Sequence, residues 1–469
     1  MLTLLGSPHC HCDGISRRGL LRIGALGAAG LTLPRLLQAE ATNGSRATGR
    51  SIICIHLDGG PPQHETIDPK PFAPVEIRGD LGPISTALPG VAIGELMPRV
   101  AARADAFAFI RTLVGSDGRH DAFQCQSGYS FKDLQSMGGR PALGSVLSRL
   151  FGRPDDPAPT FVDLMQGRPL VRNSARPGFL GPAYQPFRPD ISHLFQRELE
   201  EGMKGELARL GSEHRLSLTL DAALNAERLD DRRALLASFD QVRRHVDASG
   251  MMEAMDRFHA QAVGILTSGR LAEALDLERE DPRMIAHYTA PASESGEQST
   301  TSEGPNATLK FLLARRLIDA GVRMVSVSIS DFDTHSSNHS RMRNLLPIVD
   351  HGLHALITDL EAQGRLDDVA IVAWGEFGRT PRINDRGGRD HWPRVGPCLM
   401  AGGGFRTGQV IGETDREAAV PLSRPVHYKD VFATLYRALG IDGRSVTLDD
   451  PQGRPQYLLD AGAPLAELG

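Results

Sequence analysis

Short apolar runs rich in β-branched residues alternate with amphipathic segments along the chain, and this alternation sets the expected elements. Ser51 to Leu57 (SIICIHL) has the length and composition of a fully buried strand, and it ends at Asp58-Gly59-Gly60. Further strands are predicted, in chain order, at residues 106–111, 160–164, 322–329, 369–374 and 397–401, with Gly and Pro frequent between them.

Helical periodicity precedes the later strands. A helix predicted over 307–320 stops at Gly321, a second over 345–363 leads into the next strand, and a third at 428–439 is the last element. This repeated helix-then-strand order is typical of a mostly parallel sheet with helices on both faces. Ligands of such α/β folds gather beyond the carboxyl ends of the strands. We therefore expect the functional site at that edge.

The segment from about 191 to 290 has a different hydrophobic pattern. Leucines and charged residues recur there at helical spacing, without the pattern of a strand. We interpret it as a helical insertion, with Met251 and Met252 in its core. Residues 291–305 (PASESGEQSTTSEGP) are of low complexity and are expected to form a flexible linker. The predicted organisation is a single α/β domain over 42–469 that carries this insertion and linker.

An export signal is predicted over residues 1–41. Ser16-Arg17-Arg18 begins a twin-arginine pattern, a weakly apolar segment follows, and Ala39-Glu40-Ala41 fits the small-x-small cleavage rule. We expect a periplasmic or secreted protein whose partner during export is the twin-arginine translocase. No other apolar run approaches the roughly 18–20 residues that span a bilayer, so no transmembrane segment is expected in the mature chain.

The amino-acid composition limits the class of protein further. Hydrophobic residues make up 41% of the 469 residues, which suffices for a large core. The formal net charge is −5 and aromatic content is 5%, so no basic or base-stacking surface indicates nucleic-acid binding. Cys54, Cys125 and Cys398 remain after removal of the signal, and their odd number and wide spacing indicate no disulfide framework. Cys54 and Cys398 lie in apolar runs and are expected to be buried.

Acidic and histidine side chains follow several predicted strands at one edge. They are Asp58 after the first strand, Asp333 and His335 after 322–329, Glu376 after 369–374, and His391 in the Gly-rich loop beyond. Asp333 and His335 are two residues apart, so both side chains point the same way on an extended segment. Mixed carboxylate and imidazole ligands suit a divalent metal such as Zn, Mn, Ca or Mg.

Ordinary structural roles are open for the same residues. An Asp after a strand is often a turn or helix cap, and a single His is often a hydrogen-bonded core or surface residue. Arg379 is spaced to pair with Glu376 across one turn. The metal-site hypothesis is favoured because separate segments bring carboxylate or imidazole groups to one edge.

A string of motifs runs along nearly the whole chain. It comprises SRRGLLRIGALGAAGLTLPRLL in the signal, GGPPQHETIDPKP (59–71), RLDDRRALL (228–236), FLLARRLIDAGVRMVSV (311–327), DTH (333–335), GEFGRTPRIN (375–384), GRDHW (388–392), AGGGFRTGQVIGETD (401–415) and ALGID (438–442). These motifs resemble a bacterial secreted family known as domain of unknown function 1501. The fold of that family resembles the alkaline phosphatase and sulfatase superfamily.

The resemblance implies a set of ligands. In the superfamily, Asp and His residues hold two metals in a fixed chain order. By that order Asp58, or the segment 65–68, takes the early position. Asp333 and His335 match the central cluster, and His391 matches the late His. Glu376 stands where an Asp-His pair is expected, but Phe377 occupies the His position. That departure favours one metal over two.

The resemblance also locates a nucleophile position, and here the chain departs again. The residue that corresponds to the superfamily's Cys or Ser is Gly118, and the nearest hydroxyls are Ser116 and Thr66. His120 takes the place of a His in the family pattern. Its role as a ligand, a general base or a structural residue stays open.

The function implied by this resemblance is hydrolysis of a phosphate, sulfate or related anionic ester, small or polymeric, by a metal-dependent enzyme. Arg379 would stabilise developing negative charge, and His120 or His64 would act as general acid or base. Attack by water and a covalent intermediate both stay open. The missing ligand and nucleophile also suit a second reading, a non-catalytic binding or assembly protein on the same fold.

Overall fold

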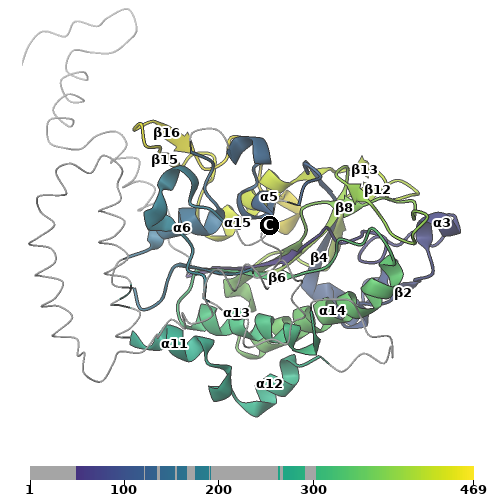
Figure 1. The fold of residues 1–469 in the computed structure, drawn as a ribbon, viewed down its shortest axis with the longest axis horizontal. Coiled ribbons are helices and arrows are strands. Elements are labelled where there is room, and N and C mark those ends of the chain that lie inside the picture. The colour runs from purple at the N-terminus through teal and green to yellow at the C-terminus, as the bar shows by residue number, and fades with distance from the viewer. Residues whose placement is uncertain are drawn as a thin grey trace, which may run out of the picture.

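One eight-stranded sheet organises the protein in the computed structural model, which describes residues 49–120, 122–134, 138–153, 156–165, 175–189, 191, 262, 264, 268–290 and 303–469 (Figure 1). The strand order is β11-β4-β10-β7-β1-β6-β5, with β14 also beside β4. These strands are β1 (Ser51–Leu57), β4 (Phe107–Val114), β5 (Phe161–Leu164), β6 (Met324–Ile329), β7 (Val369–Trp374), β10 (Gly396–Gly402), β11 (Gln409–Ile411) and β14 (Val426–His427).

The direction of β10 is the one departure from a parallel arrangement in this sheet. Strand β1 runs parallel to β6 and β7, whereas β10 runs antiparallel to both β7 and β4. No helix lies between β7 and β10, so the chain turns back beside β7 instead of crossing over. As a result, the start of β10 lies at the same edge as the carboxyl ends of β1, β4, β6 and β7. The mostly parallel sheet expected from the sequence is confirmed.

Helices cover both faces of the sheet, as the pattern predicted (Figure 1). One face packs against α4 (Pro98–Ala102), α11 (Arg270–Leu275), α12 (Pro282–Tyr288), α13 (Leu309–Asp319) and α14 (Asn338–Ala362); the other packs against α5 (Phe123–Ser127), α6 (Leu143–Phe151) and α15 (Tyr428–Ala438). Strand β1 shows the alternation, because Ile53 and Ile55 belong to the first core while Ile52 and Cys54 belong to the second.

Smaller elements surround the sheet. They are helix α3 (Val75–Arg78) and the strand pairs β2 (Pro83–Ser85) with β3 (Ala92–Gly94), β8 (Gly378–Arg379) with β9 (His391–Trp392), β12 (Glu413–Thr414) with β13 (Pro421–Ser423), and β15 (Thr447–Asp449) with β16 (Pro455–Tyr457). The sequence did not predict these pairs, since two or three residues are too few to show a period.

The predicted helix ends are partly confirmed. Gly321 stops α13 with a φ of 106°, and the N–H of Val322 donates to the carbonyl of Leu317, which is the bond pattern of a glycine-terminated helix. Helix α14 was predicted to begin at residue 345 but begins at Asn338. Its first turns are mostly polar and Pro347 lies inside the helix, so the local pattern gave no signal there.

Part of the expected organisation falls outside the described residues. The signal 1–41, residues 192–261 of the expected insertion, with Met251 and Met252, and linker residues 291–302 belong to this group. The single-domain arrangement therefore stays a prediction. No described helix is both long enough and apolar enough to cross a membrane. Among the described residues, Cys54, Cys125 and Cys398 are buried and form no disulfide, and the burial of Cys54 and Cys398 was expected.

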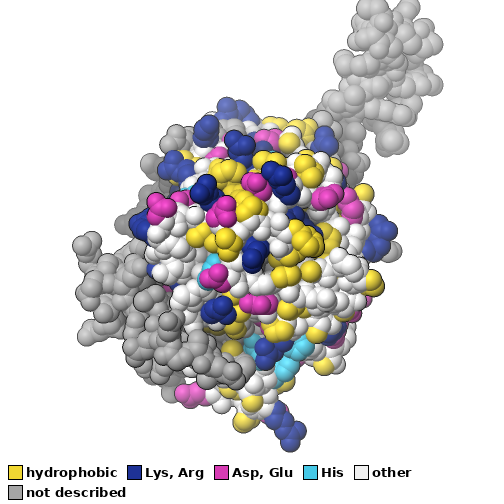
Figure 2. Space-filling view, turned by 90° about the vertical axis from the view of Figure 1, so that its right-hand side faces the viewer, with side chains coloured by type: hydrophobic (Ala, Val, Ile, Leu, Met, Phe, Trp, Pro, Cys, Tyr) yellow, Lys and Arg dark blue, Asp and Glu magenta, His cyan; other side chains and the backbone are white. Residues whose placement is uncertain are grey.

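Charged side chains of both signs are interspersed with apolar ones on the face shown in Figure 2.

Candidate metal centre

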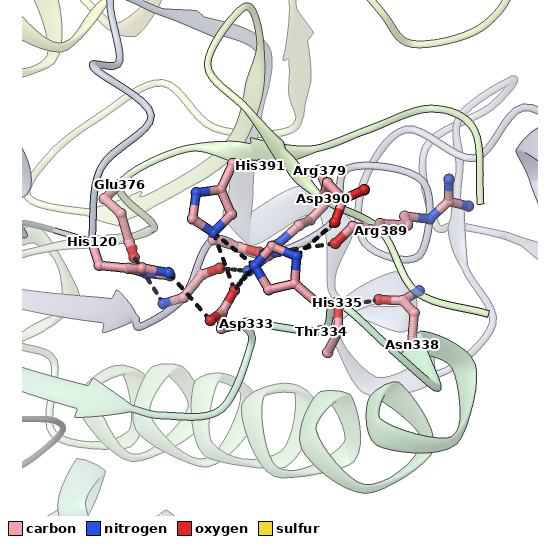
Figure 3. Close-up of polar contacts among 12 residues, drawn as sticks. His120, Asp333, Thr334, His335, Asn338, Glu376, Arg379, Arg389, Asp390 and His391 are labelled. Atoms are coloured by element: carbon pink, nitrogen blue, oxygen red, sulfur yellow. Dashed lines mark hydrogen bonds and ion pairs between the residues drawn. The ribbon is translucent and has the colours of Figure 1, made fainter. Parts of the chain in front are cut away.

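Four side chains from different parts of the sequence meet at the predicted edge of the sheet. They are His120, which follows β4, Asp333 and His335, which follow β6, and His391 in β9, just before β10 (Figure 3). One potential ligand atom from each lies within 4.8 Å of all the others. The topology explains the meeting, because β10 starts where the parallel strands end.

Asp333 is the centre of this cluster. Its Oδ1 lies 3.1 Å from Nε2 of His335 and 3.2 Å from Nε2 of His391. Its Oδ2 lies 3.2 Å from Nε2 of His120. Residues 331–334 are neither helical nor paired in a strand, and the same-side orientation expected for Asp333 and His335 is observed. All three imidazoles therefore direct the same ring nitrogen at one carboxylate.

The opposite ring nitrogen of each histidine faces an oxygen. Nδ1 of His335 lies 2.6 Å from Oδ1 of Asp390, and Nδ1 of His391 lies 3.1 Å from the carbonyl of Gly118. Nδ1 of His120 lies 3.3 Å from Oε1 of Glu376. Carbonyl and carboxylate oxygens only accept hydrogen bonds, so each Nδ1 is placed to donate one. With a cation bound in place of the protons on Nε2, this arrangement would direct the three Nε2 lone pairs at the cation, as is common around metal-binding histidines.

Two of these Nε2 atoms face each other directly. Nε2 of His335 lies 3.1 Å from Nε2 of His391. Two ring nitrogens are held together at this distance by a proton or a cation between them. Three imidazole nitrogens and one carboxylate oxygen form a donor set that suits Zn²⁺ and related divalent metals. The residues of the cluster thus fit a bound metal.

The cluster is open to solvent on one side. The side chains are between 12% exposed, for Asp333, and 38% exposed, for His335. Sites that exchange ligands keep such an opening, whereas purely structural metal sites are closed.

The side chain of Arg379 holds the carboxylate of Asp333 in place. The guanidinium is fully buried, and its Nη2 donates to Oδ1 of Asp333 at 2.6 Å and to the carbonyl of Gly59. Its Nε donates to the carbonyl of Gly60 and its Nη1 to that of Arg389. Burial raises the pKa of the Asp333 carboxyl, but hydrogen bonds from His120, His391 and Arg379 lower it far below the usual range.

These contacts differ from the role predicted for Arg379, which was to stabilise developing negative charge. Every nitrogen of its guanidinium donates to another protein group and the side chain is fully buried, so Arg379 is not placed to contact a substrate anion directly. The alternative pairing with Glu376 across one turn is replaced by the pair with Asp333. Arg379 is placed to position a ligand, and its predicted role at the transition state stays a prediction.

A second, fully enclosed group lies beside the first. It consists of His56, Asp58 and Glu376, whose potential ligand atoms also lie within 4.8 Å of one another. The sequence placed Asp58 and Glu376 with Asp333, but the structure divides the expected ligands between two groups. His56 was missed because it lies inside the apolar strand β1, although its position two residues before Asp58 was an available signal.

Glu376 and His120 connect the two groups. Glu376 accepts the backbone N–H of Gly59 at 3.0 Å and contacts both His120 and His56 at 3.3 Å. Burial raises the pKa of Glu376, but His120 and His56 outweigh it and lower the value to about 2. Burial lowers the pKa of His120, but contacts with Asp333 and Glu376 raise it to about 9. Both side chains are therefore charged at neutral pH in the metal-free protein.

Other candidates from the sequence lie apart from the four-residue cluster. Nε2 of His64 lies 2.8 Å from the carbonyl of Glu417, and burial together with nearby Arg389 lowers the pKa of His64 to about 4. The Ser116 hydroxyl donates to the carbonyl of Glu376 at 2.6 Å. The Thr66 hydroxyl donates to the carbonyl of Pro62 at 2.8 Å. These backbone contacts do not favour His64 as general acid or base, nor either hydroxyl as nucleophile.

Phe377 supports the cluster from the position where the resemblance expects a ligand. Its ring stacks on His391 with centroids 4.2 Å apart and meets the ring of His120 edge-on at 5.3 Å. Phe377 is also almost completely buried. This residue therefore fixes the orientation of two potential ligands by packing.

Comparison with known families decides the identity of the chain. Residues 49–468 match the family described as "Protein of unknown function (DUF1501)". The chain belongs to the DUF1501 family. The resemblance carried by motifs such as GEFGRTPRIN (375–384) is thereby confirmed. No curated protein matches the DUF1501 chain.

Several solved structures resemble the DUF1501 protein at low identity. Ps i-CgsB in complex with k-i-k-neocarrahexaose has 10% identity and a TM-score of 0.38, covering 83% of this chain and 72% of its own. The PsFucS1 sulfatase from Pseudoalteromonas sp. has 10% identity and a TM-score of 0.34, with coverages of 87% and 72%. The phosphonate monoester hydrolase of Agrobacterium radiobacter has 12% identity and a TM-score of 0.32, with coverages of 89% and 77%.

Gly59 offers a test of how tightly the DUF1501 site is built. Its φ is 105°, and a Cβ there would lie 2.3 Å from the backbone nitrogen of Asp333. Gly59→Ala should therefore displace Asp333 and weaken metal binding, and overpacking should cost about 1–3 kcal/mol of unfolding free energy. Denaturant unfolding and metal titration measure both effects.

Gly321→Ala is the matched control, since Gly321 has a φ of 106° but nothing within 4 Å of its Cβ position. Both substitutions share the cost of a left-handed alanine, about 1–2 kcal/mol. Equal stability losses in the two variants, with metal binding intact in both, would show that the close approach at Gly59 is unimportant.

Proposed function

We propose that this DUF1501 protein is an exported, metal-dependent hydrolase of phosphate, sulfate or related anionic esters. One observation supports it most strongly. Three imidazoles direct Nε2 at the carboxylate of Asp333 while each Nδ1 faces an oxygen. Such an arrangement, in which a cation would replace the protons on Nε2, suits metal binding.

In this proposal some residues would bind the metal and others would hold those ligands in position. Asp333, His120, His335 and His391 would hold the cation, and Arg379 would fix the Asp333 carboxylate. Asp390 and the carbonyl of Gly118 would orient two of the imidazoles. A bound divalent cation would supply Lewis-acid polarisation of the ester and neutralise developing negative charge. Because the hydroxyls of Ser116 and Thr66 are held by backbone carbonyls, attack by water is favoured over a covalent intermediate.

Hydrolysis of nitrophenyl phosphates and sulfates by the purified exported protein tests this function. We expect activity that a chelator removes and that Zn²⁺ or Mn²⁺ restores. His335→Ala should lose it, because this substitution removes one ligand and the partner of Asp390. His351→Ala, in α14 outside both clusters, is the control and should keep it. Activity that survives both chelation and His335→Ala would contradict the proposal.

Export by the twin-arginine route is the second element of the proposal. Its support is the Ser16-Arg17-Arg18 pattern and the cleavage-like Ala39-Glu40-Ala41. Replacing Arg17 and Arg18 together by Lys should leave the precursor in the cytoplasm, as cell fractionation would show. Unchanged appearance of the variant in the periplasm or medium would contradict this route.

A second candidate function is a non-catalytic binding or assembly protein. It is favoured by the hydroxyls of Ser116 and Thr66, which donate to backbone carbonyls and so are not arranged as nucleophiles. Bound metal without hydrolysis of any ester in the panel would support this alternative and contradict the enzyme.

A further inference from the structure

We propose that Asn384 is a positioning residue of the four-residue cluster, which orients Asp390 and, through it, the imidazole of His335. The inference rests on the metal-dependent function proposed above and assigns a role in its site to a residue outside the cluster. Asn384 ends the motif GEFGRTPRIN (375–384), and the sequence indicated no role for it. In the structure its side chain contacts both Asp390 and His335.

The amide nitrogen of Asn384 connects two parts of the His335–Asp390 pair. Its Nδ2 donates to the carbonyl of His335 at 3.1 Å and lies 3.4 Å from both carboxylate oxygens of Asp390. Oδ1 of Asp390 in turn lies 2.6 Å from Nδ1 of His335 (Figure 3). An amide NH₂ group carries two donors, which suffice for the carbonyl and for the carboxylate. Asn384 thus contacts the backbone of a potential metal ligand and also the carboxylate that faces its ring.

The amide oxygen of Asn384 determines which way this amide points. Its Oδ1 accepts the backbone N–H groups of Arg386 at 3.0 Å and of Gly388 at 2.9 Å, which forms a side-chain-closed turn. A flipped amide would place its NH₂ group against these two donors. It would also place its oxygen against the carbonyl of His335 and the carboxylate of Asp390, which only accept. The hydrogen bonds therefore require the NH₂ group to face the His335–Asp390 pair.

The loop that begins at Asn384 packs closely against the segment that carries His335. The N–H of Arg389 donates to the carbonyl of Thr334 at 2.9 Å. A Cβ at Gly388 would lie only 2.1 Å from the carbonyl carbon of His335. Because the two segments are hydrogen-bonded and in direct contact, a change of the loop at Asn384 should also move His335.

A purely structural turn is the competing explanation for these contacts. The turn uses only the Oδ1 acceptor, and Asp forms the same turn as Asn does. The contacts with His335 and Asp390 need a donor instead, which an ionised Asp does not have. Asn384→Asp therefore keeps the turn and removes the donor. The negative charge that it adds would by itself attract a cation, so weaker metal binding in this variant would not be an effect of charge alone.

The affinity for Zn²⁺ tests the inference. The purified protein is stripped with a chelator and titrated with Zn²⁺ in a calorimeter. We expect the dissociation constant of Asn384→Asp to rise about 10–100-fold, the usual effect of losing a residue that orients a metal ligand. Denaturant unfolding of the metal-free protein should change little. Asn344→Asp, in α14, makes the same chemical change outside the cluster and is the control, which should bind Zn²⁺ like the wild type.

A double variant tests whether Asn384 acts through Asp390. Asp390→Asn should also weaken Zn²⁺ binding, since it removes the carboxylate that faces Nδ1 of His335. Asn384→Asp combined with Asp390→Asn exchanges the amide and the carboxylate of the pair. We expect this double variant to bind Zn²⁺ no more weakly than Asp390→Asn alone, whereas two independent effects would multiply.

The outcomes separate this inference from the proposed function. Wild-type Zn²⁺ affinity in Asn384→Asp, or effects that multiply in the double variant, would overturn the positioning role and leave the metal-dependent function intact. Weaker Zn²⁺ binding as expected, without hydrolysis of any nitrophenyl ester by the wild type, would support the positioning role and contradict the enzyme. No Zn²⁺ bound by the wild type would contradict both.

Discussion

Replacing Asp333 with Asn should abolish retention of the metal and, with it, ester hydrolysis. The carboxylate of Asp333 contacts the Nε2 atoms of His120, His335 and His391 and so joins all three imidazoles. Asn removes the anionic oxygen and can place an amide donor beside the guanidinium of Arg379, which only donates. It also leaves Arg379 buried without its carboxylate, which should cost about 3–5 kcal/mol of unfolding free energy.

Elemental analysis of the purified protein measures the first effect, and denaturant unfolding measures the second. Asp331→Asn is the matched control. It makes the same chemical change two residues earlier, and Asn tolerates the left-handed backbone at Asp331, where φ is 75°. We expect wild-type metal content in Asp331→Asn. Equal metal contents in the two variants would contradict the assigned role of Asp333.

Glu65→Gln should lower the unfolding free energy by about 3–5 kcal/mol, since it removes the charge partner of a buried guanidinium. Arg389 is 0% exposed, and its Nε and Nη2 both donate to Oε1 of Glu65, at 3.0 and 2.8 Å. The same oxygen lies 3.2 Å from Nε2 of His339. Arg389 directly precedes Asp390 and His391, so this pair also fixes the loop that delivers two residues of the site.

The exposed pair of Arg424 and Glu467 provides the comparison. Its side chains are 39% and 31% exposed, and Arg424→Gln should change the stability by less than about 1 kcal/mol. Thermal or urea unfolding of both variants at neutral pH measures the difference. Losses of equal size would show that burial of the Glu65 pair does not matter.

The Glu65 pair should also make stability depend on pH. Burial raises the pKa of Glu65, but Arg389 and His339 lower it to about 2, below its ordinary value of 4.5. The folded state then binds fewer protons than the unfolded state between these two values. Stability from Glu65 is therefore complete above pH 4.5 and is lost as the pH falls towards 2. The unfolding free energy of Glu65→Gln should fall less steeply with acid than that of the wild type.

Local sequence was enough to predict most of the fold. Strands β1 and β7 match the predicted ranges residue for residue, because an apolar run between glycines and turns is a local signal. The direction of β10 was not predicted, because it depends on the absence of a helix across residues 375–395. The short edge strands β11 and β14 depend on pairing with β4, which no local pattern records.

The candidate site was predicted in part, for a similar reason. Asp333 and His335 were expected to act together from their spacing, and the structure brings them together with His391. The placement of His120 as a neighbour of Asp333 depends on where β4 lies in the sheet. His56 was read as part of an apolar strand, and only the register with β7 reveals its contact with Glu376.

The partners of the two buried arginines could not be predicted from a sequence pattern. Arg379 follows Glu376 closely in the chain but pairs with Asp333. Arg389 pairs with Glu65 across most of the sequence. Both arginines support the ends of strands that carry the site, and their partners follow from the tertiary structure alone.

Anomalous X-ray scattering from a crystal of the purified protein, recorded at the absorption edge of its bound metal, is the most direct test of the four-residue metal centre. We predict an anomalous peak among His120, Asp333, His335 and His391, about 2.0–2.2 Å from the coordinating nitrogen and oxygen atoms. A map without a peak there, in a protein whose side chains keep direct contacts of 3.1–3.2 Å to Asp333, would contradict it.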